Sequence, residues 1–315
     1  MEITAKTLQG RFLLRPSRAL GDVVAGILGR ASREKKVPIY AAAVMSNHYH
    51  LLARFDDAEH MAEFMCFVNG NLAKEVKRLT GWEHKIWRRR YGAIPVSDEE
   101  GAQVGRMRYI LAHGVKEGLV KRVTDWPGVH CAEYLMSGEA LAGHWYDRTA
   151  EYRARHAGKR FGKHDFAERE ELIFAKLPCW KEMSDEDYRA AITEMVADVE
   201  AEARVAMALS GRRVMGAKRV LRQKPFAKPK KAGQEAKKRP APLVHAATAE
   251  VRKAWIAGYR LFEAAYRAAA ERLKKGERDV RFPDGCFPPG LPFVPFPKDD
   301  GRGGQGARAS PVGGG

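Results

Sequence analysis

The stretch VPIYAAAVMSNHYHLLARF, residues 37–55, determines which fold the rest of the chain can adopt. Two largely apolar runs, 37–45 and 48–55, lie on either side of the polar pair Ser46-Asn47. Short apolar runs separated by a turn-forming pair are typical of two adjacent antiparallel strands. The stretch therefore predicts a β-hairpin that is buried in a sheet.

Two histidines lie at the start of the second of these strands. Because side chains alternate along a strand, His48 and His50 project from one face and Tyr49 from the other. Two imidazoles side by side can bind one metal ion. With 10 His in 315 residues, about 0.3 His-x-His pairs are expected by chance, so the pair alone is weak evidence for a metal site.

Hydrophobic periodicity and capping signals predict the elements around the hairpin. Strands are expected at 9–17 and 87–97, and helices at 18–35, 58–79 and 97–113, the last opening on the capping-box pair Ser97 and Glu100. The order β-α-β-β-α-β-α predicts an α+β fold with a ferredoxin-like antiparallel sheet, followed by a mainly helical C-terminal extension. In that topology the first and third strands are central, so the histidine strand lies in the middle of the sheet.

Composition divides the chain into five segments. We expect an N-terminal domain at 1–157, a helical extension at 158–211, a basic linker at 212–246, a C-terminal helix with a Pro/aromatic segment at 247–300, and a disordered tail at 301–315. The linker is assigned from its charge and prolines: residues 212–239 contain twelve Lys or Arg and one Glu, which is +11 of the net charge of +17.

The charge favours a polyanionic partner, most simply nucleic acid, with Lys228, Lys230 and Lys231 among the phosphate-binding residues. The alternative is a solvated tail that only aids solubility. No apolar run is long enough to span a membrane, and the first ten residues lack a signal-peptide core. Four scattered cysteines without a CxxC pair argue against a disulfide framework, so a cytoplasmic, nucleoid-associated protein is expected.

The helix expected at 97–113 carries a second pair of polar side chains. Tyr109 and His113 are four residues apart and share a face, which lies opposite the apolar stripe of Val104, Met107 and Leu111. Filling the core does not explain a tyrosine and a histidine on that face, so they add weight to the histidine strand as part of a functional site.

Together these motifs resemble the single-tyrosine HUH transposases, closest to the REP-associated branch of IS200-like transposases. The resemblance covers about residues 9–150 and rests on His48-Tyr49-His50 after Met45-Ser46-Asn47, Ile86-Trp87-Arg88-Arg89-Arg90-Tyr91, Tyr109-Ile110-Leu111-Ala112-His113-Gly114, Gly118-Leu119-Val120 and Trp126-Pro127. It identifies 1–157 as the transposase domain. The chain departs from the family at His113-Gly114, where Asn-Pro is common.

The resemblance implies metal-dependent nicking and rejoining of single-stranded DNA at hairpin-forming sequences. Tyr109 is then the nucleophile that forms a 5′-phosphotyrosine, and His48, His50 and His113 bind a divalent ion, Mg²⁺ or Mn²⁺. Arg88, Arg89 and Arg90 bind DNA phosphates, unless they are merely a solvated strand end. The partner is single-stranded or hairpin DNA, and the protein is a monomer or a homodimer.

Two other functions remain open. A domesticated protein of the same fold could bind DNA without turnover, although it would have no reason to retain His48, His50 and Tyr109 together. A structural metal site in an RNA-binding ferredoxin-like domain is the third hypothesis, but the aromatic strand signature of RNA-recognition motifs is missing.

Overall fold

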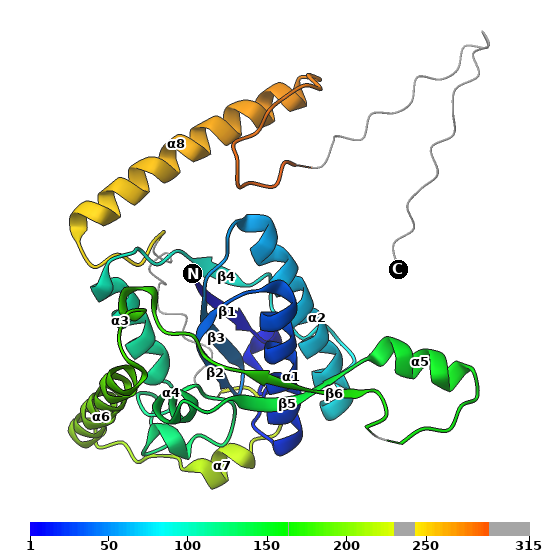
Figure 1. Ribbon diagram of the computed structural model, residues 1–315, viewed down its shortest axis with the longest axis vertical. Helices are drawn as coiled ribbons and strands as arrows, with labels where there is room; N and C mark the ends of the chain where they lie inside the picture. Colours follow the sequence, from blue (N-terminus) through cyan, green and yellow to red (C-terminus); the bar gives the residue numbers. More distant parts are fainter. Residues whose placement is uncertain (163, 230–242, 290–315) are drawn as a thin grey trace. The chain divides into compact units, whose positions relative to one another are not determined.

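Four antiparallel strands form the central sheet in the order β2-β3-β1-β4 (Figure 1). The strands are β1 (Glu2–Lys6), β2 (Ile39–Met45), β3 (His48–Ala53) and β4 (Gly92–Ile94). With the intervening helices this is the ferredoxin-like β-α-β-β-α-β-α arrangement, which confirms the fold class. The histidine strand β3 is central, between the hairpin partner β2 and the N-terminal strand β1.

Two long helices pack together on one side of the sheet: α1 (Arg18–Lys35) and α2 (Ala58–Thr80) (Figure 1). The Ser17 side chain caps α1 by accepting a hydrogen bond from Leu20 N, and Asp57 caps α2 by accepting one from His60 N. Both helices bury an apolar stripe, which includes Val24 and Ile27 of α1.

Helices α3 (Glu100–Leu111) and α6 (Asp185–Leu209) lie on the other side of the sheet (Figure 1). Ser184 caps α6 as its sequence predicts, accepting a hydrogen bond from Asp187 N. The capping box expected at Ser97 is wrong: its hydroxyl donates to the Glu99 carboxylate, and Glu99 is the residue that precedes the helix.

A second, two-stranded sheet covers the outer side of α1. It consists of β5 (Leu141–Tyr146) and β6 (Ala167–Leu172), which are joined through the short helix α5 (Arg148–His156). Glycines allow this close packing, because a Cβ on Gly26 would lie 2.1 Å from the carbonyl carbon of His144. The predicted domain boundary at residue 157 therefore falls inside a hairpin, and the extension after it is not wholly helical.

The strand expected at 9–17 is wrong. In that stretch Gln9 and Gly10 adopt positive φ angles of 55° and 67°, and the successive residues Leu13 and Leu14 are both buried. Positive φ angles are incompatible with a strand, and two adjacent buried side chains break its alternation. The first strand is β1, where buried Ile3 and Ala5 alternate with the polar residues of EITAK.

The strand expected at 87–97 is much shorter than predicted. Only β4 pairs with β1, over three residues, while Trp87 makes a single bridge to Thr7. Pro95 ends the strand because it has no N–H to donate.

Part of the basic segment is folded against the rest of the chain, contrary to the expected linker. Helix α7 (Ala217–Leu221) contains the fully buried Val220, and Met215 N donates to Gly118 O at 2.8 Å. The Ser46 hydroxyl also donates to the Gln223 side chain at 2.6 Å. Periodicity over five helical residues is too short to be recognised in the sequence.

The structure is a computed structural model that describes residues 1–162, 164–229 and 243–289. Residues 1–260 form one compact unit and 261–315 a second, so the chain is not divided at residue 211 as composition suggested. The remaining helices are α4 (Ala132–Ser137) and α8 (Ala249–Lys274). In the described part of the chain, no helix combines the length and apolar character needed to cross a bilayer.

Candidate metal centre and nucleophile

The two histidines of β3 share the sheet face that is turned toward α3. Their ring centroids are 5.1 Å apart, and Tyr49 points the other way, where its hydroxyl donates to Asn69 of α2 at 2.7 Å. The alternation of side chains along the strand predicted this arrangement. His50 is buried, whereas His48 is partly exposed at the end of the strand.

The third histidine reaches the same place from the end of α3. The helix ends at Leu111, and Gly114 follows with a φ of 91°, a left-handed conformation that favours glycine. This turn places the buried His113 ring 4.3 Å from the His50 ring, centroid to centroid. One ring nitrogen from each of His48, His50 and His113 can be chosen so that all three lie within 4.8 Å of one another.

Hydrogen bonds determine which nitrogen of each ring is available. Nδ1 of His48 lies 2.7 Å from Asn47 Oδ1, Nδ1 of His50 lies 3.1 Å from Glu2 Oε1, and Nδ1 of His113 lies 3.2 Å from Ile110 O. Each Nδ1 thus has an oxygen acceptor, which favours the tautomer with its proton on Nδ1. The Nε2 lone pair then remains free in all three rings, as metal-binding histidines require.

Burial keeps the imidazoles of His48 and His113 uncharged. It lowers the pKa of His48 to about 3, and the neighbouring His50 and nearby lysines lower it further. Burial likewise lowers the pKa of His113 to about 2, with further contributions from His50 and Lys116. Because neutral imidazole is the metal-binding form, this donor set fits a divalent transition-metal ion.

Glu2 and Thr4 support the site, and the sequence analysis missed both of them. In the register of β1 against β3, Thr4 lies opposite His50, and its hydroxyl is 3.1 Å from His50 Nδ1. Burial alone would raise the pKa of the Glu2 carboxyl, but hydrogen bonds from His245 and His50 outweigh it and hold that pKa well below its usual range. The alternating polar and apolar residues of EITAK were the signal that could have revealed them.

A segment far along the chain also reaches Glu2. His245 Nε2 is 2.9 Å from Glu2 Oε2. The His245 backbone N–H donates to Pro95 O, and its carbonyl oxygen accepts from Ser97 N, on either side of Val96. No sequence signal connected residue 245 with the histidine strand, because the contact depends on the path of the folded chain.

Tyr109 lies beside the histidines. Its ring centroid is 4.9 Å from that of His113 and 5.5 Å from that of His50, and 36% of the residue is exposed. Lys116 Nζ lies 3.5 Å from the centre of the Tyr109 ring. Burial raises the pKa of Tyr109, and Glu2 and Glu117 raise it further, so the phenol keeps its proton unless additional positive charge is brought near it.

The structure does not bring the predicted DNA-binding arginines to the histidines. Arg88, Arg89 and Arg90 are exposed, and the last two line a groove with Met65 and Asn69 of α2, on the opposite side of the sheet from the histidines. Among the predicted lysines, Lys228 is exposed in the described chain, whereas Lys230 and Lys231 lie outside the described residues.

Part of the chain is similar to known proteins. Residues 17–112 match the family model described as "Transposase IS200 like". No curated protein matches the chain. Among solved structures, a candidate transposase from Deinococcus radiodurans R1 is similar at 18% identity, covering 35% of this chain and 85% of that one, with a TM-score of 0.26.

A TM-score at that level supports no conclusion about fold or function, so the family match carries the comparison. It covers less than a third of the chain, from the cap of α1 to the residue before His113, and it includes His48, His50 and Tyr109. The segment that carries the histidine strand and the tyrosine is therefore similar in sequence to IS200-like transposases.

Proposed function

We propose that the protein is a transposase that nicks and rejoins single-stranded DNA at hairpin-forming sequences, using a divalent metal ion and a tyrosine nucleophile. The observation that carries the proposal is the convergence of three imidazoles, two from β3 and one from the end of α3, beside the ring of Tyr109. The match of residues 17–112 to IS200-like transposases supports the same class of reaction.

His48, His50 and His113 would hold the metal through Nε2. When bound there, a divalent ion supplies positive charge that neutralises the scissile phosphate and orients it. Three imidazole donors favour softer ions such as Mn²⁺, Co²⁺ or Zn²⁺ over Mg²⁺.

Tyr109 would perform the covalent step. Its phenolic oxygen attacks phosphorus as its proton leaves to solvent, the bond from phosphorus to the 3′-oxygen breaks, and that oxygen takes up a proton from solvent. The products are a 5′-phosphotyrosine and a free 3′-hydroxyl. Attack of a 3′-hydroxyl on the phosphotyrosine reverses these changes and rejoins the strand. Lys116, next to the ring, would lower the cost of negative charge on the phenolic oxygen.

The test is incubation of the protein with hairpin-bearing single-stranded oligonucleotides and Mn²⁺ or Mg²⁺. A covalent protein–DNA adduct that survives denaturing electrophoresis and maps to Tyr109 by mass spectrometry is the expected result. A protein that binds the oligonucleotide but forms no adduct with any divalent metal would instead be a DNA-binding protein without turnover, the second candidate function.

A further inference from the structure

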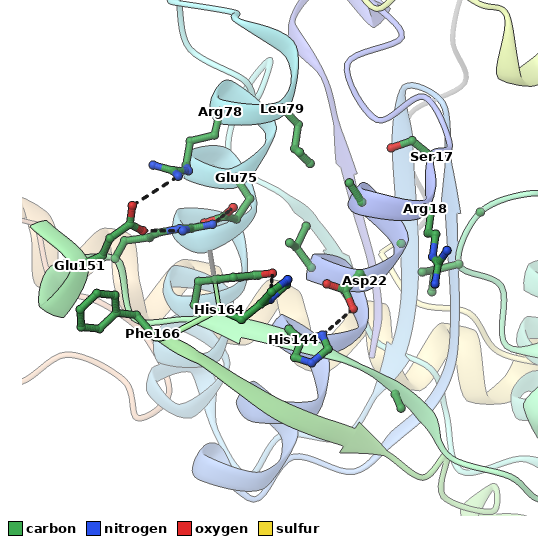
Figure 2. Close-up of a pocket in the computed structure, with 18 of the residues that line it drawn as sticks. Ser17, Arg18, Asp22, Glu75, Arg78, Leu79, His144, Glu151, His164 and Phe166 are labelled. Carbon is green, nitrogen blue, oxygen red and sulfur yellow. Dashed lines mark hydrogen bonds and ion pairs between the residues drawn. The ribbon is translucent and has the colours of Figure 1, made fainter. Parts of the chain in front are cut away.

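A second groove lies away from the histidine site, on the outer side of α1 and α2. It has a volume of about 1080 Å³ and is bounded by the N-terminal part of α1, the C-terminal part of α2 and the arm formed by β5, α5 and β6 (Figure 2). The groove is large enough for several nucleotides or a short peptide. None of the residues proposed above for metal binding or DNA cleavage lines it.

Buried ion pairs attach the arm to α2 at its base. Arg148 donates to both carboxylate oxygens of Glu75, at 2.5 and 2.6 Å, and to Glu151 at 2.5 Å. Glu75 and Glu151 are both buried, so breaking these contacts would leave a carboxylate without its partner. These ion pairs therefore hold the base of the arm against α2.

Aromatic and imidazole rings line the arm side of the groove. Tyr146, Phe161, His164 and Phe166 contribute to the wall, and the Tyr146 hydroxyl is 3.2 Å from His164 Nδ1. Beside them on β5, His144 Nδ1 is 2.8 Å from Asp22 Oδ1 of α1, as Figure 2 shows. A wall of rings can stack with nucleobases of any sequence.

The groove also carries a surplus of positive charge. Arg78, Arg148 and Arg155 pair with only two carboxylates, those of Glu75 and Glu151. The Asp22 carboxylate also lines the groove, so these three arginines are balanced by three carboxylates.

Arg18, at the other wall, supplies the surplus positive charge, and Figure 2 shows it beside Ser17. It is exposed and has no ion-pair partner among the described residues. Further along the arm, Arg153, Lys159 and Arg160 are exposed and likewise unpaired within the described part of the chain. Charges of this kind attract a polyanion over a distance.

We propose that this groove binds a single-stranded stretch of the DNA on which the tyrosine site acts, with bases against the rings of the arm and phosphates on Arg18 and the arginines of the arm. This inference rests on the proposed function for the identity of the DNA. The groove reaches Val129, whose carbonyl accepts a hydrogen bond from Val44 N at 2.9 Å, close to the turn that leads into His48.

The experiment measures binding without cleavage, so that it does not depend on whether the proposed function is correct. Fluorescence anisotropy of labelled dT20 is recorded in EDTA with the full chain carrying Tyr109→Phe. In this background we expect Phe161→Ala together with Arg18→Gln to weaken binding at least about tenfold, because each stacked base and each phosphate contact contributes substantially to affinity. The slope of log affinity against log salt should fall by about 0.7, because one cation is lost.

Two matched substitutions on exposed α6 positions are the controls. Arg204→Gln removes an exposed cation, and Leu209→Ala removes an exposed apolar side chain. Neither should change affinity for dT20 by more than about twofold. Arg18→Glu tests the charge separately, because an acid in the first turn of a helix is favourable and should not disturb folding.

Unchanged affinity in both the double variant and Arg18→Glu would overturn the proposal. It would also be overturned if polyglutamate bound as tightly as dT20 and lost affinity equally in the variants, since the groove would then bind acidic protein segments. A twenty-base-pair duplex that competes as well as dT20 would exclude stacking on unpaired bases. The proposal is supported if the groove variants lose dT20 binding and the controls do not. If the same groove substitutions, made in the protein that retains Tyr109, still allow the covalent adduct with short hairpins, the groove and the tyrosine site are separate surfaces.

Discussion

Glu2→Gln should weaken metal binding although Glu2 is not itself one of the three proposed ligands. The Glu2 carboxylate lies within 3.1 Å of His50 Nδ1, 2.9 Å of His245 Nε2 and 3.4 Å of an Arg106 guanidinium nitrogen. A glutamine has the same shape, but its amide nitrogen can only donate. It therefore cannot accept from all of these donors, and the preference for a proton on His50 Nδ1 weakens.

The expected loss follows from the type of contact that is removed. Groups that orient a metal-binding histidine typically contribute 10- to 100-fold to metal affinity, which corresponds to about 1.4 to 2.7 kcal/mol. Thr4→Val removes the other contact to the same His50 nitrogen, at 3.1 Å. Because that contact is between neutral groups, its loss should cost about 0.5–1.5 kcal/mol, or roughly two- to tenfold.

Isothermal titration calorimetry with Mn²⁺ and Co²⁺ measures these affinities, and thermal unfolding by circular dichroism reports whether each variant is folded. Glu59→Gln is the control, because Glu59 is exposed in the first turn of α2, on the other side of the sheet from the histidines. The reasoning is refuted if folded Glu2→Gln binds metal as tightly as the parent protein. It is equally refuted if Thr4→Val causes the larger loss, since the carboxylate would then not be the group that orients His50.

Four further predictions concern the site, the packing and the basic segment. Tyr109→Phe should abolish the covalent DNA adduct while DNA binding, measured by anisotropy, persists, because only the nucleophilic oxygen is lost. His48→Ala should remove metal-dependent cleavage, and His113→Ala should lower calorimetric metal affinity less, because water or phosphate can replace one ligand. Gly26→Ala should lower the free energy of unfolding in urea by about 3 kcal/mol, because its Cβ would lie 2.1 Å from a backbone atom of β5 that cannot move freely. Deleting residues 230–239, which contain five Lys or Arg and one Glu, should lower affinity for all DNA sequences alike and reduce the salt slope.

Each of these predictions has an outcome that contradicts it. An undiminished adduct in Tyr109→Phe would move the nucleophile to another residue, and unchanged metal binding in His48→Ala would remove the metal site. Gly70→Ala is the control for Gly26, because a Cβ at Gly70 meets nothing within 4 Å and should stabilise α2 slightly. A deletion of 230–239 that changes the choice of DNA target at a constant salt slope would show that the segment recognises sequence.

Much of the central fold could be predicted from the sequence alone, and so could the placement of His48 and His50 on one face of their strand. The period of two places His48 and His50 on one face wherever the strand lies, because alternation is a property of the extended backbone. Helices α1 and α2 were predicted to within two residues at each end, since long apolar stripes make their periodicity clear.

Short elements were not predictable in the same way. The first strand was expected at 9–17 but is β1 at Glu2–Lys6, and the three residues of β4 were expected to extend over eleven. A strand of three to five residues is defined by its partner rather than by its own composition. Because the first strand is at residues 2–6, Glu2 and Thr4 lie next to His50. A strand expected at 9–17 could not have identified these two residues.

Tertiary structure alone decided which distant residues meet. His245 reaches Glu2 and the base of the arm at Arg148 reaches Glu75, so that the site and the groove each combine residues more than seventy positions apart. These contacts depend on loop paths and on glycines such as Gly26 that let β5 lie against a helix, and neither follows from local propensity. The sequence alone determined which side chains the histidine strand carries and that both histidines share one of its faces, because both properties are local. The groove, in contrast, exists only where the folded chain brings its walls together.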